Sequence, residues 1–293
     1  MNITNIRLTF IAFAIFIVFC ALPCCTPISV GFPPKPDEEI ALTSEHFYAV
    51  RDGLNIYCVT YRPENSSGKL PTVILSHSNS LTHTAMDGYA QDIAKKGFAT
   101  CCFDFCGGGS GSQSDGSTDD MTLFTETADL EAVLETVSRR QYVDESSIYL
   151  LGSSLGGVVS ALVAENHKYD ISGLILFYPA FNIPELVNSF SNFMPGMGNS
   201  AFIDSVKGLD LYSMIGGFSR PVLILQGSKD FIVPVSSSQK AAEIYPKATL
   251  QIIEGANHGF NEANLGSMGS ALLGGTDYDS IVMPFVYEFL GVE

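Results

Sequence analysis

The sequence predicts an α/β fold in which a mostly parallel sheet is covered by helices on both faces. The first observation is that short, nearly continuous apolar runs recur along the chain and alternate with segments of helical character. Such runs are typical of parallel strands buried on both faces, and alternating β and α units form one sheet between helix layers. The second observation is composition. A chain of 293 residues, 46% of them hydrophobic, can bury a large core without disulfides or metals.

The first two strands are expected to form a hairpin. His46–Arg51 and Asn55–Tyr61 are strand-like runs joined by Asp52-Gly53, a dipeptide that favours tight hairpin turns. Apolar runs farther along the chain are predicted to be the strands of the parallel part. They are Thr72–Ser76, Phe98–Phe103, Ser147–Leu151, Gly173–Phe177, Val222–Gln226 and Leu250–Ile253.

Helices are predicted between these strands. Met86–Lys96 ends in two lysines followed by Gly97, which indicates a helix C-terminus because cations and glycine are favoured there. A helix is also expected over Asp120–Arg139, with Asp120 as its N-cap, and a last helix over Ser280–Leu290. In the second helix the apolar stripe comprises Leu123, Leu130, Leu134 and Val137, whereas Glu126, Glu131 and Glu135 are expected to point elsewhere.

The amino terminus has the pattern of an export signal. Residues 10–22 are continuously apolar and follow the single early cation Arg7. A run of this length suits the core of a signal peptide better than a membrane span, which needs about 20 residues. We therefore expect residues 1–25 to be a signal peptide or a membrane or lipid anchor, and the protein to be exported, either secreted or attached to a membrane through this end. An uncleaved anchor stays open because no charge stands between Arg7 and Lys35.

The rest of the chain is expected to be a tether and one folded domain. Residues 26–45 are rich in proline and predict an extended tether, and residues 46–293 form the domain. Residues 180–218 interrupt the alternation and predict a cap insertion over a pocket, whereas the Gly- and Ser-rich residues 264–276 predict a loop. Four apolar side chains of the insertion are candidates for an acyl pocket, although each could equally pack the insertion onto the body: Phe181, Phe190, Phe193 and Met194.

The net charge excludes nucleic acid as a partner, and the cysteines and histidines do not form the pattern of a metal site. With 15 Lys+Arg against 31 Asp+Glu, the formal net charge is −16, and such a surface repels nucleic acid. Cysteines 58, 101, 102 and 106 lie in or beside apolar runs and are expected to be small buried hydrophobes. In an exported protein a disulfide from Cys58 to Cys101 or Cys102 is the alternative. The histidines are scattered and no paired CxxC motif is present, so we expect no metal.

A strand, a tight turn and a helix carry the candidate nucleophile. The apolar run ending at Leu151 leads into Gly152-Ser-Ser154-Leu-Gly156 and then into small and β-branched residues of helical character. In a GxSxG turn the serine has a strained backbone, so the glycines leave room for neighbouring backbone while the hydroxyl projects from the sheet. The strand before the motif and the helix after it make this match far more specific than a bare GxSxG.

A serine nucleophile needs a base that is held by an acid. Asp230 follows the apolar run Val222–Gln226, and His258 follows the last predicted strand. Both are therefore expected at the carboxyl edge of the sheet, where open α/β folds have their sites. We expect His258 to take the Ser154 proton and Asp230 to hold the other ring nitrogen of the imidazole.

An oxyanion hole requires two backbone donors. One is expected from Leu155, which follows the nucleophile, and the other from the loop His77-Ser78-Asn79-Ser80, with Asn79 preferred and Ser78 as the alternative. His77 is expected to be an architectural hydrogen-bonding residue.

These motifs resemble those of the α/β-hydrolase superfamily over nearly everything from His46 to Leu290. Within it the chain is most similar to feruloyl (cinnamoyl) esterase-like and serine aminopeptidase-like hydrolases. The resemblance rests on the His77 loop, on residues 103–110 with Met121-Thr122, on the Ser154 elbow, and on the segments around Asp230 and His258. It implies an eight-stranded, mostly parallel sheet, a Ser-His-Asp triad and no metal or organic cofactor.

Two loops depart from the pattern of these relatives. Relatives usually have Gly where Ser78 stands, and an Arg/Asn-Gly-His-Gly run where this chain has Cys106-Gly107-Gly108-Gly109. The insertion is also shorter than the lid of feruloyl esterases. These changes affect the oxyanion loop and the acyl pocket rather than the triad.

The function expected is hydrolysis of carboxylic esters of small molecules through an acyl-Ser154 intermediate. A serine peptidase that removes N-terminal residues is the first alternative, with Glu185 or Asp204 available to bind a substrate amine. A noncatalytic binding protein on the same fold is the second.

Overall fold

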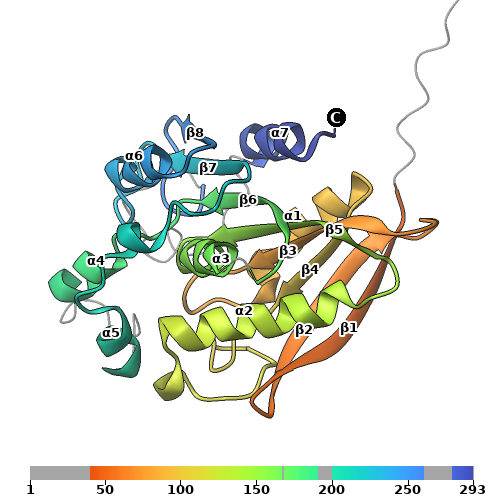
Figure 1. Ribbon diagram of the computed structural model, residues 1–293, viewed down its shortest axis with the longest axis horizontal. Helices are drawn as coiled ribbons and strands as arrows, with labels where there is room; N and C mark the ends of the chain where they lie inside the picture. The colour runs from red at the N-terminus through yellow and green to blue at the C-terminus, as the bar shows by residue number, and fades with distance from the viewer. Residues whose placement is uncertain (1–39, 167, 191–199, 261–278, 293) are drawn as a thin grey trace, which may run out of the picture. The chain divides into compact units, whose positions relative to one another are not determined.

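The sheet has eight strands in the order β1-β2-β4-β3-β5-β6-β7-β8 (Figure 1). The computed structural model describes residues 40–292 except 167, 191–199 and 261–278. The predicted signal and most of the tether, and the predicted loop at 264–276, lie outside the described residues. The pairs β1–β2 and β2–β4 are antiparallel and the other five pairs are parallel. The predicted eight-stranded, mostly parallel α/β sheet is confirmed.

The hairpin at the edge of the sheet is longer than predicted. Strands β1 (Leu42–Arg51) and β2 (Leu54–Pro63) pair over their whole length, from Leu42 opposite Pro63 to Arg51 opposite Leu54. The turn between them has positive φ at both central residues, 51° at Asp52 and 84° at Gly53, as a type I′ hairpin turn requires. Because β1 begins at Leu42, its first residues belong to the sheet rather than to the predicted tether.

The remaining strands match the predicted apolar runs, with shifted ends. They are β3 (Leu70–Ser76), β4 (Ala99–Phe103), β5 (Val143–Ser153), β6 (Ile171–Phe177), β7 (Val222–Gly227) and β8 (Ala248–Ile253). Strand β5 lies between β3 and β6, in the middle of the sheet. Its buried end therefore delivers the residues that follow Ser153 to the carboxyl edge of the parallel strands.

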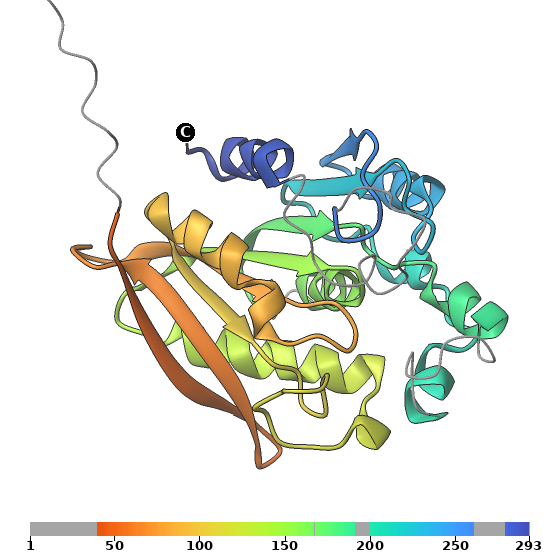
Figure 2. The ribbon, with the colours of Figure 1, turned by 180° about the vertical axis from the view of Figure 1, so that it is seen from behind.

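Helices cover both faces. Helices α1 (Asp87–Lys95) and α7 (Asp279–Leu290) share a buried cluster with one face, and α2 (Leu123–Ser138), α3 (Leu155–Glu165) and α6 (Val235–Ile244) share one with the other. Figure 2 shows α1, in gold, lying along the sheet. The described parts of the insertion form α4 (Ile183–Phe190), α5 (Ser200–Val206) and the 3₁₀ turn η3 (Leu211–Met214). Two more 3₁₀ turns, η1 (His83–Ala85) and η2 (Thr118–Asp120), precede α1 and α2.

Two expectations for α2 were wrong. The N-cap is Thr122 and not Asp120, because Asp120 closes η2 while Thr122 and Thr125 form a reciprocal capping box. Glu126, expected to point away from the core, is only 1% exposed. Its carboxyl is buried because α2 contacts other elements on several sides, including β1, α3 and α5. Burial raises the pKa of Glu126 well above its usual value, with the nearby Asp129 carboxylate as the second cause, and both causes favour the protonated carboxyl.

The four described cysteines are free and buried, as predicted from their apolar surroundings: Cys58, Cys101, Cys102 and Cys106. The alternative of a disulfide from Cys58 is not what the structure has. Burial raises the pKa of the Cys101 and Cys102 thiols well above the usual value, so they are inert neutral groups. Within residues 40–292, gaps excepted, no helix is long and apolar enough to cross a membrane.

Candidate active site

Ser154 lies in a strained turn between β5 and α3. Its φ is 52° and its ψ is −114°, a conformation that side chains with a Cβ rarely adopt. A Cβ on Gly152 would stand 2.2 Å from the Gly156 carbonyl oxygen, and a Cβ on Gly156 would stand 2.4 Å from the carbonyl oxygens of Ser76 and His77. The spatial role predicted for the two glycines is therefore confirmed: only backbone fits at these positions.

The structure brings Ser154, His258 and Asp230 into one hydrogen-bonded chain. His258 Nε2 is 3.1 Å from Ser154 Oγ, and His258 Nδ1 is 2.8 Å from Asp230 Oδ2. The three residues come from the ends of β5, β7 and β8, and each is between 5% and 8% exposed. Since the carboxylate accepts at Nδ1, that nitrogen carries the proton and Nε2 is left with a lone pair toward the serine hydroxyl. This geometry suits general-base activation of a hydroxyl.

Four donors hold the Asp230 carboxylate. Its Oδ1 accepts from the backbone N–H groups of Ile232 (2.9 Å) and Val233 (2.8 Å), and its Oδ2 accepts from Gln226 Nε2 (3.0 Å) as well as from His258. Gln226, at the end of β7, also donates to the Val233 carbonyl and accepts from Ser238. Gln226 was not predicted from the sequence as a residue of the site. Its signal was available, because a glutamine in an otherwise apolar buried strand must find hydrogen-bond partners.

The two predicted oxyanion donors lie in segments that meet at this edge. Leu155 is the first residue of α3, so the helix cannot satisfy its N–H internally. Asn79 is half-buried in the loop after β3, and Gly156 packs against the carbonyls at the start of this loop. The roles of Leu155 and Asn79 in binding an oxyanion stay predictions.

His77 is tied to backbone on both ring nitrogens. Nδ1 lies 2.8 Å from the Ser78 carbonyl, to which it donates, and Nε2 accepts from the Phe105 N–H at 3.3 Å. Burial lowers the pKa of His77 to about 4, so the ring is neutral over the physiological range. The interpretation of His77 as an architectural residue fits this arrangement.

The candidate pocket residues are only partly within the described structure. Phe181 is buried, and its ring packs against Tyr212 with centroids 5.6 Å apart, which favours the packing interpretation for this side chain. Phe190 ends α4, but its side chain is outside the description, as are Phe193 and Met194 altogether. Glu185 and Asp204, the candidates for binding an amine, are both exposed. Among the described residues no group of three or more His, Cys, Asp or Glu is arranged to hold a metal ion.

Comparisons with known proteins agree with this fold. A family model described as serine aminopeptidase, S33, matches residues 69–207. Est1E from Butyrivibrio proteoclasticus, solved with ferulic acid bound, has a TM-score of 0.67 at 24% identity and covers 83% of this chain and 97% of its own. The esterase EaEST from Exiguobacterium antarcticum has a TM-score of 0.60 at 18% identity, with 84% and 98% covered.

A curated relative adds sequence similarity. The alpha/beta hydrolase domain-containing protein WAV2 of Arabidopsis thaliana is 30% identical over 114 residues, which are 36% of this chain and 37% of that protein. The chain spans about a third of the length of the curated relatives it matches first. With the fold, the strand order and the matched segment in place, the assignment follows. The chain has the α/β-hydrolase fold, and its residues 69–207 are similar to the serine aminopeptidase family.

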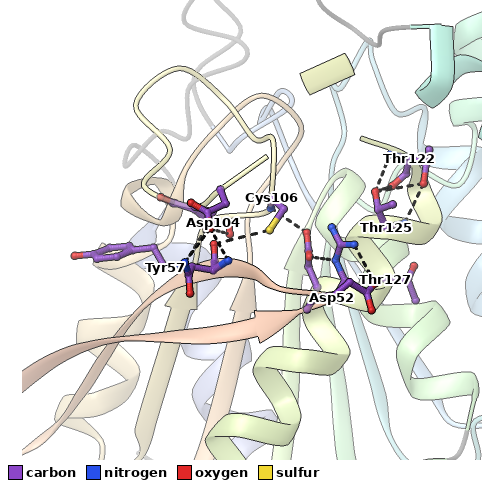
Figure 3. A network of polar contacts seen from close by, with 12 residues as sticks. Asp52, Tyr57, Asp104, Cys106, Thr122, Thr125 and Thr127 are labelled. Atoms are coloured by element: carbon purple, nitrogen blue, oxygen red, sulfur yellow. Dashed lines mark hydrogen bonds and ion pairs between the residues drawn. The ribbon is translucent and has the colours of Figure 1, made fainter. Parts of the chain in front are cut away.

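One of the two loops that depart from the pattern of relatives, the loop that contains Cys106, is anchored by polar contacts (Figure 3). The Cys106 N–H donates to Asp129 Oδ2 at 2.9 Å, and Asp129 Oδ1 accepts from Arg51 Nε. Burial and the Asp129 carboxylate raise the pKa of the Cys106 thiol to about 12. The thiol is therefore neutral at pH 7 and offers no rival nucleophile to Ser154.

The first residue of the same loop is fixed as firmly. Asp104, labelled beside Cys106 in Figure 3, accepts from both the N–H and the Nδ1 of His83, at 2.7 and 2.8 Å, and from the Gln113 N–H at 2.7 Å. Its side chain is fully buried. The loop after β4, which contains the altered glycine run, therefore begins at a fixed residue, and Asp104 ties it to His83 in the segment that follows β3.

Proposed function

We propose that this chain is an exported serine hydrolase that cleaves carboxylic esters of small molecules through an acyl-enzyme intermediate. The observation that carries the chemistry is the hydrogen-bonded chain from Ser154 through His258 to Asp230. Est1E, which shares the fold, was solved with ferulic acid bound, and EaEST is named an esterase; both support an ester substrate. Export rests on the apolar residues 10–22 of the amino terminus.

The geometry supports the following sequence of steps. His258 Nε2 accepts the Ser154 proton as Oγ attacks the ester carbonyl, and the Asp230 carboxylate stabilises the imidazolium that forms. The carbonyl oxygen gains negative charge and is bound by the N–H groups of Leu155 and Asn79. His258 then returns the proton to the leaving alcohol. Water, activated by the same imidazole, hydrolyses the acyl-Ser154 ester and frees the enzyme.

Aminopeptidase activity is the second candidate. The match of residues 69–207 to the serine aminopeptidase family model favours it. Such an enzyme binds a free substrate amine with an acidic side chain, and the exposed carboxylates of Glu185 and Asp204 in the insertion are the candidates.

The test is hydrolysis by the full chain of p-nitrophenyl acetate, butyrate and octanoate, methyl ferulate and an aminoacyl p-nitroanilide. Ser154→Ala should abolish turnover and fluorophosphonate labelling, whereas Ser219→Ala, an exposed serine, should change neither. Cleavage of the anilide in preference to the esters would support the peptidase. Absence of both turnover and labelling in the wild type would refute a serine hydrolase and leave the fold as a binding protein.

A further inference from the structure

Tyr178, the residue after β6, is held against the candidate nucleophile in an unfavourable backbone conformation. Its φ is 37°, in the left-handed region that a bulky side chain rarely occupies. The carbonyl of the preceding Phe177 accepts from the Ser154 N–H at 2.9 Å, and the N–H of Ala180 donates to the Ser154 carbonyl at 3.0 Å. One backbone hydrogen bond on each side of Tyr178 therefore fixes this turn to the strained elbow.

The ring of Tyr178 supports the candidate base. Its centroid is 4.5 Å from that of His258, and the ring also packs edge to face against Phe260, with centroids 4.8 Å apart. Phe260 also has a positive φ, 57°. The imidazole thus lies against the Tyr178 ring, which Phe260 and the backbone turn hold in position. This contact limits rotation of His258 away from Ser154.

The hydroxyl of Tyr178 reaches the other parts of the site. The hydroxyls of Ser153 and Ser78 lie close enough to it to lower its pKa against the effect of burial, and these two hydroxyls are 2.9 Å apart. Burial raises the pKa of Tyr178 far above its usual value, so the group is a neutral phenol. Ser153 precedes the nucleophile and Ser78 precedes Asn79 in the loop after β3. One buried cluster of three hydroxyls therefore joins the nucleophile elbow, the oxyanion loop and the residue beneath the base.

We infer that Tyr178 is a positioning residue for this hydrolase, and that it holds His258 with its ring and the Ser78–Asn79 loop with its hydroxyl. The partner of the Tyr178 hydroxyl in this loop is the Ser78 hydroxyl, which the glycine that relatives usually have at this position would lack. The inference rests on the proposed hydrolase function. Tyr178 is buried and contacts His258, so we assign it a positioning role that acts through the base and the loop.

The test compares Tyr178→Phe, Ser78→Ala and their double variant in the full chain, with p-nitrophenyl butyrate as substrate. Each single variant loosens the oxyanion loop and should lower kcat about 5- to 10-fold with little change in KM, because one net hydrogen bond is lost in the transition state. Ser78→Ala also removes the hydrogen bond to Ser153 Oγ, so it should be the slower single variant. The double variant should be slower than Ser78→Ala by no more than about twofold, because the contact between the Tyr178 and Ser78 hydroxyls is already lost. Fluorophosphonate labelling should slow in parallel.

Tyr245→Phe is the matched control. Tyr245 is also buried, but its hydroxyl has no hydrogen-bond partner, so kcat should stay at the wild-type value while any general effect of removing a buried hydroxyl appears in Tm. A kcat for Tyr178→Phe equal to wild type, or effects of the two changes that multiply in the double variant, would overturn the inference while leaving the serine hydrolase intact. A wild type that neither turns over nor labels refutes the proposed function and the inference with it.

Discussion

Asp230→Asn is the substitution that tests the candidate triad most sharply, because it changes hydrogen-bond donors and acceptors without changing shape. The carboxylate accepts four hydrogen bonds, from the N–H groups of Ile232 and Val233, from Gln226 and from His258. An asparagine has one oxygen, which satisfies about two of these donors. If that oxygen stays with the two backbone groups, the amide NH₂ faces His258 and Gln226.

The expected loss of activity follows from the histidine tautomer. An amide that donates to Nδ1 leaves the ring proton on Nε2, which then points at Ser154 Oγ and cannot accept its proton. A base in the wrong tautomer lowers kcat by about 10⁴-fold, which is about 5 kcal/mol of transition-state stabilisation. Separately, the donors left unpaired should lower the free energy of unfolding by about 1–3 kcal/mol. The catalytic loss should therefore far exceed what partial unfolding could cause.

The assay measures kcat and KM on p-nitrophenyl butyrate, the rate of fluorophosphonate labelling and the thermal midpoint for each protein. Asp170→Asn is the matched control, because Asp170 is exposed and pairs with Arg220 at the amino end of β6; its activity should equal that of wild type. Retention of activity within about tenfold by Asp230→Asn, in a folded protein, would show that Asp230 does not orient the base.

Three further outcomes are expected. First, kcat/KM should fall as the pH is lowered, because a protonated imidazole cannot accept the Ser154 proton; a profile with no acid limb down to the pH of unfolding would exclude His258 as the base. Second, burial lowers the pKa of His77 to about 4, so between that value and the usual value near 6.5 the unfolded chain binds more protons than the folded one. This contribution to the free energy of unfolding, measured in urea titrations, should be fully present above about pH 6.5 and decline by about 3 kcal/mol toward pH 4. His77→Asn should remove most of this decline, and the control His46→Asn, at an exposed position, should keep it. Third, burial raises the pKa of Glu126, so the folded state holds a proton that the unfolded chain releases above about pH 4.5, and stability is lost as pH rises. The free energy of unfolding of Glu126→Gln should therefore exceed that of wild type by at least about 1 kcal/mol at pH 8 and by less at pH 5. An equal difference at both pH values would show that Glu126 is ionised in the folded state at both.

Hydrophobic patterning predicted the sheet because its central strands, such as β4, β6 and β7, are almost wholly buried. The predicted ends were less accurate where burial does not mark them. Strand β5 extends to Val143 through polar residues that are partly or fully exposed and that lie at an irregularity in its pairing with β3, so no apolar pattern marks its start. Helix α6 was missed because its sequence, VSSSQKAAEI, has little apolar periodicity. The burial of Glu126 was missed because a pattern on one helix does not reveal how many neighbours surround that helix.

The site could be predicted as far as chain order and strand ends reach. Ser154, Asp230 and His258 each follow a buried strand, and parallel strands bring such residues to one edge. What holds them could not be predicted, because Gln226 reaches the acid through the register of β7 with the loop after it, and Tyr178 reaches the base through a backbone turn. Neither contact corresponds to a spacing of residues that could be recognised in the sequence.

Backbone strain is concentrated where the chemistry is expected. Among the described residues, five non-glycine residues have positive φ. One, Asp52, is in the hairpin turn, but Ser80, Ser154, Tyr178 and Phe260 lie in the oxyanion loop, the elbow, the turn beneath the base and the segment after His258. Each such conformation costs about 1–3 kcal/mol and persists only where surrounding structure imposes it. Here the central strands and their backbone hydrogen bonds to the elbow hold these residues at positive φ. The rigid sheet, which hydrophobic patterning predicts, therefore also maintains a site that patterning alone does not reveal.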